Sequence, residues 1–247
     1  MYALKKILTW LLIGVILAVG VLGLYIYIGL PDVRELQTHN PTTTALIEYR
    51  VRQAQEANKT IDIRQDWVAF ETIPQLLKDT IRISEDAAFY QHKGVDFTEL
   101  KESIKKNWEK GKYVRGASTI SQQLAKNLYL STHKSILRKI KEYFVARRLE
   151  AHLSKDRIFH LYLNIIELGP GIFGVQAASK YYFYKNVDEL SLEEIVRLTA
   201  VIPLPLRIDP RGESDWLKWK AAWISDTLKR YQYIRDDEHR TVIKRFQ

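Results

Sequence analysis

The chain has 247 residues, of which 46% are hydrophobic, enough for one large domain or for one domain with an appendage. It has no cysteine, which excludes disulfides, thiolate nucleophiles and cysteine metal sites. Lysine and arginine total 38 against 29 acidic residues, and the resulting formal charge of +9 favours anionic partners.

Residues 7–30 form a long run without charge, ILTWLLIGVILAVGVLGLYIYIGL. As a helix this run would be about 36 Å long, which is enough to cross a bilayer. A cleaved signal peptide is the alternative, but its apolar core would be shorter and would end in a small-x-small site, whereas this run continues to Ile28 and beyond. Lys5 and Lys6 precede the run and predict a cytoplasmic N-terminus over residues 1–6. We therefore expect a single-pass transmembrane helix in the cytoplasmic (inner) membrane, with the rest of the chain on the periplasmic or extracytoplasmic side.

On that side of a membrane, the partners that suit a basic chain are anionic lipid headgroups, a phosphorylated lipid or an acidic wall polymer, rather than nucleic acid. The plain alternative is a basic protein that stays soluble and close to its membrane. Charge alone does not separate these interpretations.

Behind the apolar run we expect a polar, threonine-rich connector over residues 31–60 and a globular domain over residues 61–247. Helical patterns dominate, and we find no internal repeat and no convincing β-hairpin. The expected helices cover 97–110, 135–153 and 157–168. After a break at GPGIFG (169–174) we expect a small-residue helix with Ala177, Ala178 and Tyr181, and then a helix from the Ser191/Glu194 capping box to about Ile202. Trp216, Trp219 and Trp223 recur at helical spacing near the C-terminus, and we assign them to core packing. The predicted fold class is mainly α.

The stretch RGASTISQQLAKN, residues 115–127, concentrates polar side chains. Its apolar residues Ile120 and Leu124, with Leu128 just beyond, recur every four positions and predict a helix. Ser118, Gln122 and Lys126 would then share another face, which is either a solvated face with Ser118 as the N-cap or a hydrogen-bonding surface for a sugar or a phosphate.

Two carboxylates are candidates for chemistry. Glu85 precedes Phe89, His92 and Gly94 in SEDAAFYQHKG, a pattern typical of a helix that ends in a loop. We interpret His92 as a structural residue of that loop rather than as a proton carrier.

The second carboxylate is Glu142. It follows Lys134 and Arg138 at helical spacing in KSILRKIKE, residues 134–142. Such a stripe is usually surface ion pairing. Opposite a second carboxylate and the polar face of residues 115–127, it would instead form a centre for sugar transfer, with one carboxylate as the base and cations for a departing phosphate.

Five segments occur in the order and spacing of the motifs of the peptidoglycan glycosyltransferase family, which this chain resembles from about Glu85 to Pro210. They are EDAAFYQHKG, RGASTISQQLAKN, RKIKE, RIFHLYLN and GVQAASKYYF. The resemblance implies a membrane enzyme with a lysozyme-like helical lobe and a smaller lobe near the bilayer. No transpeptidase domain is recognisable, because Ser103 and Lys106 form a Ser-x-x-Lys string without companion motifs. We therefore expect glycosyl transfer without transpeptidation.

The resemblance also assigns roles to residues. Glu85 would be the catalytic base and Glu142 a second essential carboxylate. Where the family commonly has arginine, this chain has Lys134, which keeps the charge but loses the bidentate fork for phosphate. The substrate-binding residues would be Ser118, Thr119, Gln122, Gln123, Lys126, Asn127, Lys134, Arg138 and Asn164.

The implied reaction joins lipid II to a growing lipid-linked glycan strand, and both are partners together with the membrane. The base takes the proton of the acceptor 4-hydroxyl, whose oxygen attacks the anomeric carbon with inversion, and undecaprenyl pyrophosphate leaves as an anion that Lys126, Lys134 and Arg138 would stabilise. No metal ligand set is expected and no cofactor is required, although Mg²⁺ or Mn²⁺ can assist such chemistry. Proteins of cell-wall synthesis or division are further candidate partners.

Two other functions fit parts of the pattern. A lysozyme-like wall-cleaving enzyme would share the lobe and one glutamate but would not need the cationic face. A non-catalytic membrane-anchored scaffold that binds wall polymer would have no use for a base, so the presence of both glutamates argues against it.

Overall fold

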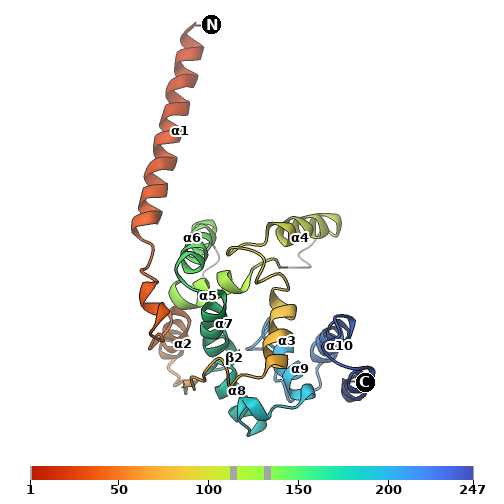
Figure 1. The fold of residues 1–247 in the computed structure, drawn as a ribbon. Coiled ribbons are helices and arrows are strands. Elements are labelled where there is room, and N and C mark those ends of the chain that lie inside the picture. Colours follow the sequence, from red (N-terminus) through yellow and green to blue (C-terminus); the bar gives the residue numbers. More distant parts are fainter. Residues whose placement is uncertain (1, 112–115, 131–134, 247) are drawn as a thin grey trace.

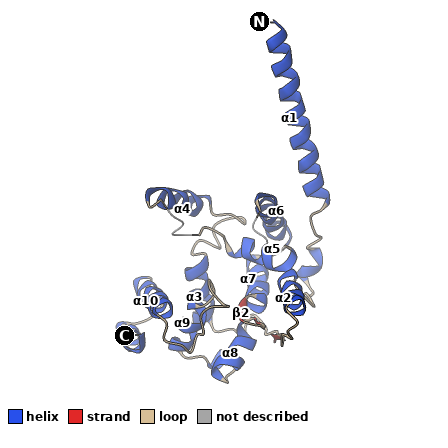
Figure 2. Ribbon diagram, turned by 180° about the vertical axis from the view of Figure 1, so that it is seen from behind, coloured by secondary structure: helices blue, strands red, loops and turns tan. Residues whose placement is uncertain are grey.

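A computed structural model describes residues 2–111, 116–130 and 135–246 of the chain (Figure 1). Its elements are α1 (Tyr2–Ile28), η1 (Arg34–Gln37), α2 (Ala45–Glu56), β1 (Arg64–Gln65), α3 (Gln75–Glu85), α4 (Phe97–Glu109), α5 (Ile120–Tyr129), α6 (Ile136–His152), α7 (Lys155–Ile165), β2 (Glu167–Gly169), β3 (Ile172–Phe173), α8 (Val175–Phe183), η2 (Val187–Glu189), α9 (Leu192–Ala200), α10 (Asp215–Arg230) and α11 (Asp236–Phe246). The mainly α fold class is confirmed, and Figure 2 shows that strands occupy only a small patch between the helices.

The N-terminal helix α1 projects away from the rest of the molecule, and most of its large apolar side chains are exposed (Figures 1 and 2). Its end is fastened to α6, where Arg148 donates hydrogen bonds to the carbonyls of Leu30 and Pro31. Within the part of the chain that the structure describes, no helix has both the length and the hydropathy that a membrane span requires. The predicted transmembrane helix at 7–30 is therefore not confirmed by the structure.

The connector predicted over 31–60 holds the helix α2, which Thr44 caps by accepting from the amide of Ile47. Leu46 and Ile47 pack with Phe173 of β3, so α2 lies against the domain that follows. Arg50 of α2 also forms a bidentate pair with Glu167 of β2, with Nε to Oε1 at 2.7 Å and Nη2 to Oε2 at 2.8 Å. This segment therefore packs on the domain and is not an extended connector.

The small sheet has the order β1-β3-β2, with β1 parallel and β2 antiparallel to β3. The helix predicted over 157–168 ends at Ile165, and residues 167–169 form β2, so the prediction of no β-hairpin was wrong. The physical reason is the turn at Pro170 and Gly171, which has φ of 76° at the glycine and folds β2 back on β3.

The core lies around α5 and α7. Ile120, Leu124 and Leu128 of α5 are all buried, as their spacing predicts. In α7 the residues from Ile158 to Ile165 are nearly all buried, because α5, α6 and α8 pack around this helix. Gly174, at the start of α8, has φ of 81°, and a Cβ there would lie 2.5 Å from the carbonyl oxygen of Asn164. Only glycine allows α8 to begin this close to the end of α7.

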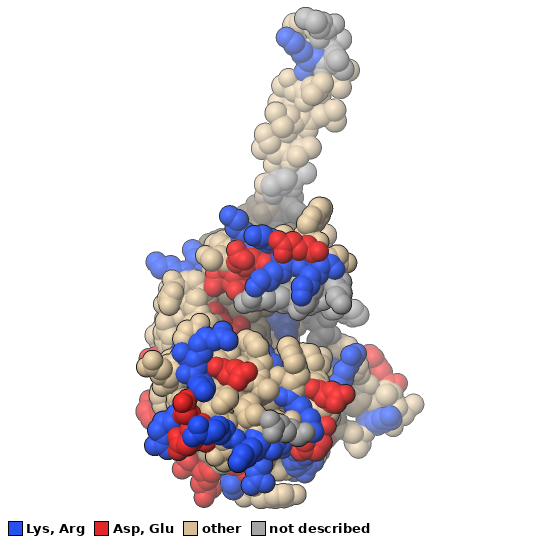
Figure 3. Space-filling model, turned by 90° about the vertical axis from the view of Figure 1, so that its right-hand side faces the viewer, with Lys and Arg blue, Asp and Glu red and all other residues tan. Residues whose placement is uncertain are grey.

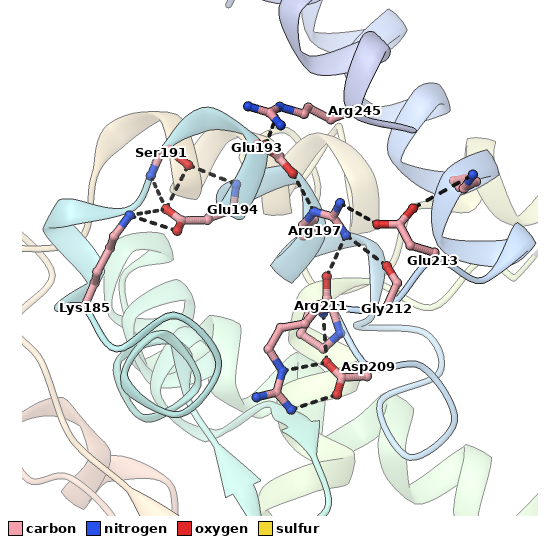
Figure 4. A network of polar contacts seen from close by, with 12 residues as sticks. Lys185, Ser191, Glu193, Glu194, Arg197, Asp209, Arg211, Gly212, Glu213 and Arg245 are labelled. Atoms are coloured by element: carbon pink, nitrogen blue, oxygen red, sulfur yellow. Dashed lines mark hydrogen bonds and ion pairs between the residues drawn. The ribbon is translucent and has the colours of Figure 1, made fainter. Parts of the chain in front are cut away.

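Helix α9 and the loop before α10 are joined by a network around Arg197 (Figure 4). The predicted capping box of Ser191 and Glu194 is confirmed at the start of α9, which ends at Ala200. Buried Arg197 donates to the carbonyls of Pro210 and Gly212, each at 3.0 Å, and also pairs with Glu193 and Glu213. The network fixes where α10 begins, and α10 carries a residue of the site described next.

Candidate active site

The first part of the site is the end of α3. Glu85 is the last residue of this helix, and Asp86 leaves helical geometry with φ of −162°. The amide of Gln123 on α5 donates to Glu85 Oε2 at 3.0 Å, and the hydroxyl of buried Tyr162 donates to the amide oxygen of Gln123 at 3.1 Å. The tyrosine therefore fixes which end of the Gln123 amide faces the carboxylate.

Burial raises the pKa of the half-buried Glu85 carboxyl, while the hydrogen bond from Gln123 and the charge of Lys220 oppose this and lower the pKa. Lys220 comes from α10, and burial lowers its pKa whereas the charge of Glu85 raises it. Sequence reasoning missed Lys220, since nothing in its spacing links it to a glutamate so far away along the chain.

The loop after Glu85 is held by Asp86. Its carboxylate accepts from the backbone amide of Ile120 at 3.0 Å and contacts His92 Nε2 at 3.0 Å from both oxygens. The amide of Gly94 donates to His92 Nδ1 at 3.2 Å, so Nε2 is the nitrogen that carries the proton toward Asp86. These contacts tie the end of α3 to the start of α5 and support the structural interpretation of His92.

The second part of the site lies on α6. Glu142 is 3% exposed, Arg138 Nη1 donates to its Oε2 at 2.6 Å, and Lys139 Nζ pairs with its Oε1. Lys139 also donates to the hydroxyl of Ser118 at 2.9 Å. The predicted partner Lys134 lies outside the described residues, and Lys139, which sequence reasoning did not select, contacts both Glu142 and Ser118. Arg138 Nε is buried and has no hydrogen-bond partner among the described residues.

Lys126 lies between the two parts, half-buried on α5. It has no hydrogen bond or ion pair with another residue that the structure describes. Burial lowers the pKa of its ammonium, the charges of Arg138 and Lys139 lower it further, and those of Glu142 and Glu167 raise it. An ammonium without a fixed partner beside two other cations is suited to bind an anion.

Several predicted binding residues are engaged inside the protein. The helix α5 begins at Ile120 with Thr119 as its N-cap, so Ser118 is neither the cap nor on the helix. The predicted face of Ser118, Gln122 and Lys126 is therefore wrong, because the buried side chain of Gln122 completes the capping box with Thr119.

Asn164 is fully buried and holds the 60s loop, accepting from the amide of Val68 and donating to the carbonyls of Val68 and His160. Asn127 is also buried. We therefore interpret Thr119, Gln122 and Asn164 as residues that shape the site, whereas Gln123, Lys126 and Ser118 reach its polar groups.

The face of the molecule that carries α4 and α10 is hollowed between α4 and the body of the domain, and basic side chains are visible inside the hollow (Figure 3). Among the described residues, no cluster of three or more His, Asp or Glu side chains is placed to hold a metal ion.

A carboxylate whose pKa is raised by burial, an amide that donates to it, and three cations near a second carboxylate are groups suited to proton transfer and to anion binding. Comparison with known proteins agrees: a family model described as transglycosylase matches residues 53–229. The chain belongs to the transglycosylase family.

Relatives named biosynthetic peptidoglycan transglycosylase are 38–40% identical to this chain over the aligned residues. The protein of Janthinobacterium sp. (strain Marseille) is 38% identical over 83% of this chain and 87% of its own length. That of Alcanivorax borkumensis is 39% identical over 86% and 83%, and that of Nitrosospira multiformis is 40% identical over 75% and 80%.

Proposed function

We propose that the protein is a peptidoglycan glycosyltransferase that polymerises lipid II into glycan strands, using a lysozyme-like helical domain. The observation that carries the proposal is the pair of carboxylates in unlike surroundings. Glu85 has a raised pKa and no fixed cationic hydrogen-bond partner among the described residues, whereas Glu142 is held by two cations. Unlike surroundings suit unlike roles.

Glu85 would act as the general base. In its ionised form it takes the proton of the acceptor 4-hydroxyl while that oxygen forms the new bond to the anomeric carbon of the donor. The bond from that carbon to the pyrophosphate oxygen breaks on the opposite face, so the configuration inverts. A raised pKa makes the carboxylate a stronger base, provided that the working pH is high enough to ionise it.

The cations would stabilise the leaving group. Undecaprenyl pyrophosphate departs as an anion, so positive charge can replace the acid that a glycosidase uses to protonate a sugar oxygen. We assign this role to Lys126, Arg138 and Lys139, and its support is that all three lie near Glu142. Glu142 would orient Arg138 and Lys139 rather than move a proton. Lys134 stays a prediction for the same role.

Attachment to the inner membrane through residues 7–30 is part of the proposal. Its support is the absence of any charge in this run and the exposure of the large apolar side chains of α1. Lys5 and Lys6 favour residues 1–6 in the cytoplasm and the domain on the periplasmic side. A C-terminal reporter should then be inaccessible to a cytoplasmic label, and a mature chain beginning after Leu30 would contradict the anchor.

The test of function is an assay of purified full-length protein with lipid II, read as glycan strands on a gel. Polymer should form with the unmutated protein, and Glu85→Gln should reduce the rate by at least about a hundredfold while lipid II still binds, because glutamine keeps the size but not the basicity of the side chain. Cleavage of purified glycan without polymerisation would indicate a wall-cleaving enzyme. Binding without either reaction would indicate a scaffold.

A further inference from the structure

Helix α10 has two dissimilar faces. Leu217, Ala221 and Leu228 are fully buried against the domain. Trp219 and Trp223, which are four positions apart and so on one side of the helix, are 58% and 41% exposed. The prediction that the tryptophan stripe packs in the core is therefore wrong for these two residues. Large aromatic side chains exposed together on a stable helix indicate an interaction surface.

The two indoles are held in place by their neighbours. The ring of Trp216 lies 5.2 Å from that of Trp219 at an angle of 52°, and the ammonium of Lys220 lies 4.1 Å from the ring centroid of Trp223. A pair of indoles fixed in this way loses little freedom when a ligand covers it.

One residue of the pair, Trp223, is linked to the proposed base through Lys220. Lys220, which contacts Trp223, is close enough to Glu85 for each charge to act on the other, and α10 packs on α3, the helix that Glu85 ends. The network around Arg197 holds the loop that leads into α10 (Figure 4). Lys220 therefore connects the aromatic surface with the surroundings of Glu85.

A membrane does not account for this surface. Helix α1 rises from the side of the domain on which α6 lies, whereas α10 lies on the opposite side and far from the N-terminus (Figures 1 and 2). A ligand in contact with Trp223 would instead lie next to the Lys220 ammonium, in a setting that is aromatic and polar at once. Sites for small polar molecules have this composition.

We propose that Trp219 and Trp223 form a platform on which a pyranose ring of an N-acetylated glycan stacks beside Glu85. The proposal rests on the proposed function, since that function makes such a glycan the substrate. A pyranose has an apolar face of C–H groups and an edge of hydroxyls, and a fixed indole can cover the first while leaving the second free. The platform would hold a sugar ring near the base, and Lys220 would keep Trp223 in its stacking position.

The probe for the test is chitotetraose, a soluble oligomer of N-acetylglucosamine, titrated to millimolar concentration into the full-length protein in detergent and followed by calorimetry. Trp219→Ala and Trp223→Ala should each weaken binding by about three- to tenfold, the range expected for loss of one aromatic contact. Trp108→Ala is the matched control, because Trp108 is 87% exposed on α4, outside the platform, and should leave binding unchanged. Trp223→Phe should retain most of the affinity. Circular dichroism should show that each variant is folded.

The same variants in the lipid II assay should raise KM by a similar factor and change kcat less. Unmutated protein that does not bind chitotetraose, or alanine variants that bind it normally, would overturn the platform even if polymerisation is normal. Unmutated protein that binds chitotetraose through Trp219 and Trp223 but makes no polymer would support the platform and refute the proposed function.

Discussion

Arg50→Ala should destabilise the whole domain, although Arg50 belongs to the segment that sequence reasoning treated as a connector. Its guanidinium makes two short bonds to Glu167, and the two side chains are only 16% and 6% exposed. Removing the arginine leaves the Glu167 carboxylate of β2 buried, without its partner and with little access to water.

The expected loss in the free energy of unfolding follows from the burial of the Arg50–Glu167 pair. Breaking a buried pair by removing one partner costs about 3–5 kcal/mol, and the residual exposure of Arg50 places this pair near about 3 kcal/mol. For a domain of this size each kcal/mol lowers Tm by about 2–4 °C, so the expected shift is about 6–12 °C. Thermal unfolding of the full-length protein, followed by circular dichroism, measures it.

Arg34→Ala is the matched control, since Arg34 pairs with Asp32 in the same N-terminal segment but the two side chains are 70% and 55% exposed. We expect its Tm to be unchanged. The double variant Arg50→Ala/Glu167→Gln should regain part of the loss, because it removes the stranded charge. An Arg50→Ala shift below about 2 °C would refute the reasoning that α2 is part of the domain.

Two further predictions concern the site. Gln123→Leu removes a hydrogen bond that lowers the pKa of Glu85, so this pKa should rise. The acidic limb of the pH–rate profile for lipid II polymerisation should then move to higher pH, and an unchanged limb would show that it does not report the ionisation of Glu85. Lys139→Ala removes the cation that contacts Glu142 and Ser118 and should lower the polymerisation rate by about tenfold or more, whereas Lys139→Arg should retain much of the rate. Equal rates for the unmutated protein and both variants would exclude a role of Lys139 in leaving-group stabilisation.

The elements that the sequence predicts well are those whose signals are local. The helices at 97–109 and 136–152 follow from helical patterns in the sequence, and the start of α9 follows from a capping box four residues long. Glu85 and Glu142 are found through motifs. In the structure Gln123 of α5 contacts Glu85, and Lys126 of the same helix is close enough to Glu142 for their charges to interact.

What the sequence did not predict depends on contacts between distant segments. Lys139 is three positions before Glu142, and pattern reasoning does not single it out, because helical spacing alone does not say that its ammonium contacts both Glu142 and Ser118. Lys220 approaches Glu85 only after α10 packs on α3. The exposure of Trp219 has the same origin, since helical spacing defines a face but not what covers it.

The described part of the polar stretch at 115–127 has two separate roles rather than forming one binding face: its first residues fix the start of α5, and its later residues reach the two carboxylates. Thr119 and Gln122 satisfy each other in the capping box, and Asp86 accepts from the amide of Ile120, so the start of α5 is fixed against the loop after Glu85. With the helix thus fixed, Gln123 contacts Glu85, while Lys126, three positions on, lies beside Glu142 and its cations. One short helix therefore sets the separation between the proposed base and the charges proposed to receive the pyrophosphate. In a displacement reaction attack and departure occur on opposite sides of one carbon, so this separation is the quantity that the fold must hold constant.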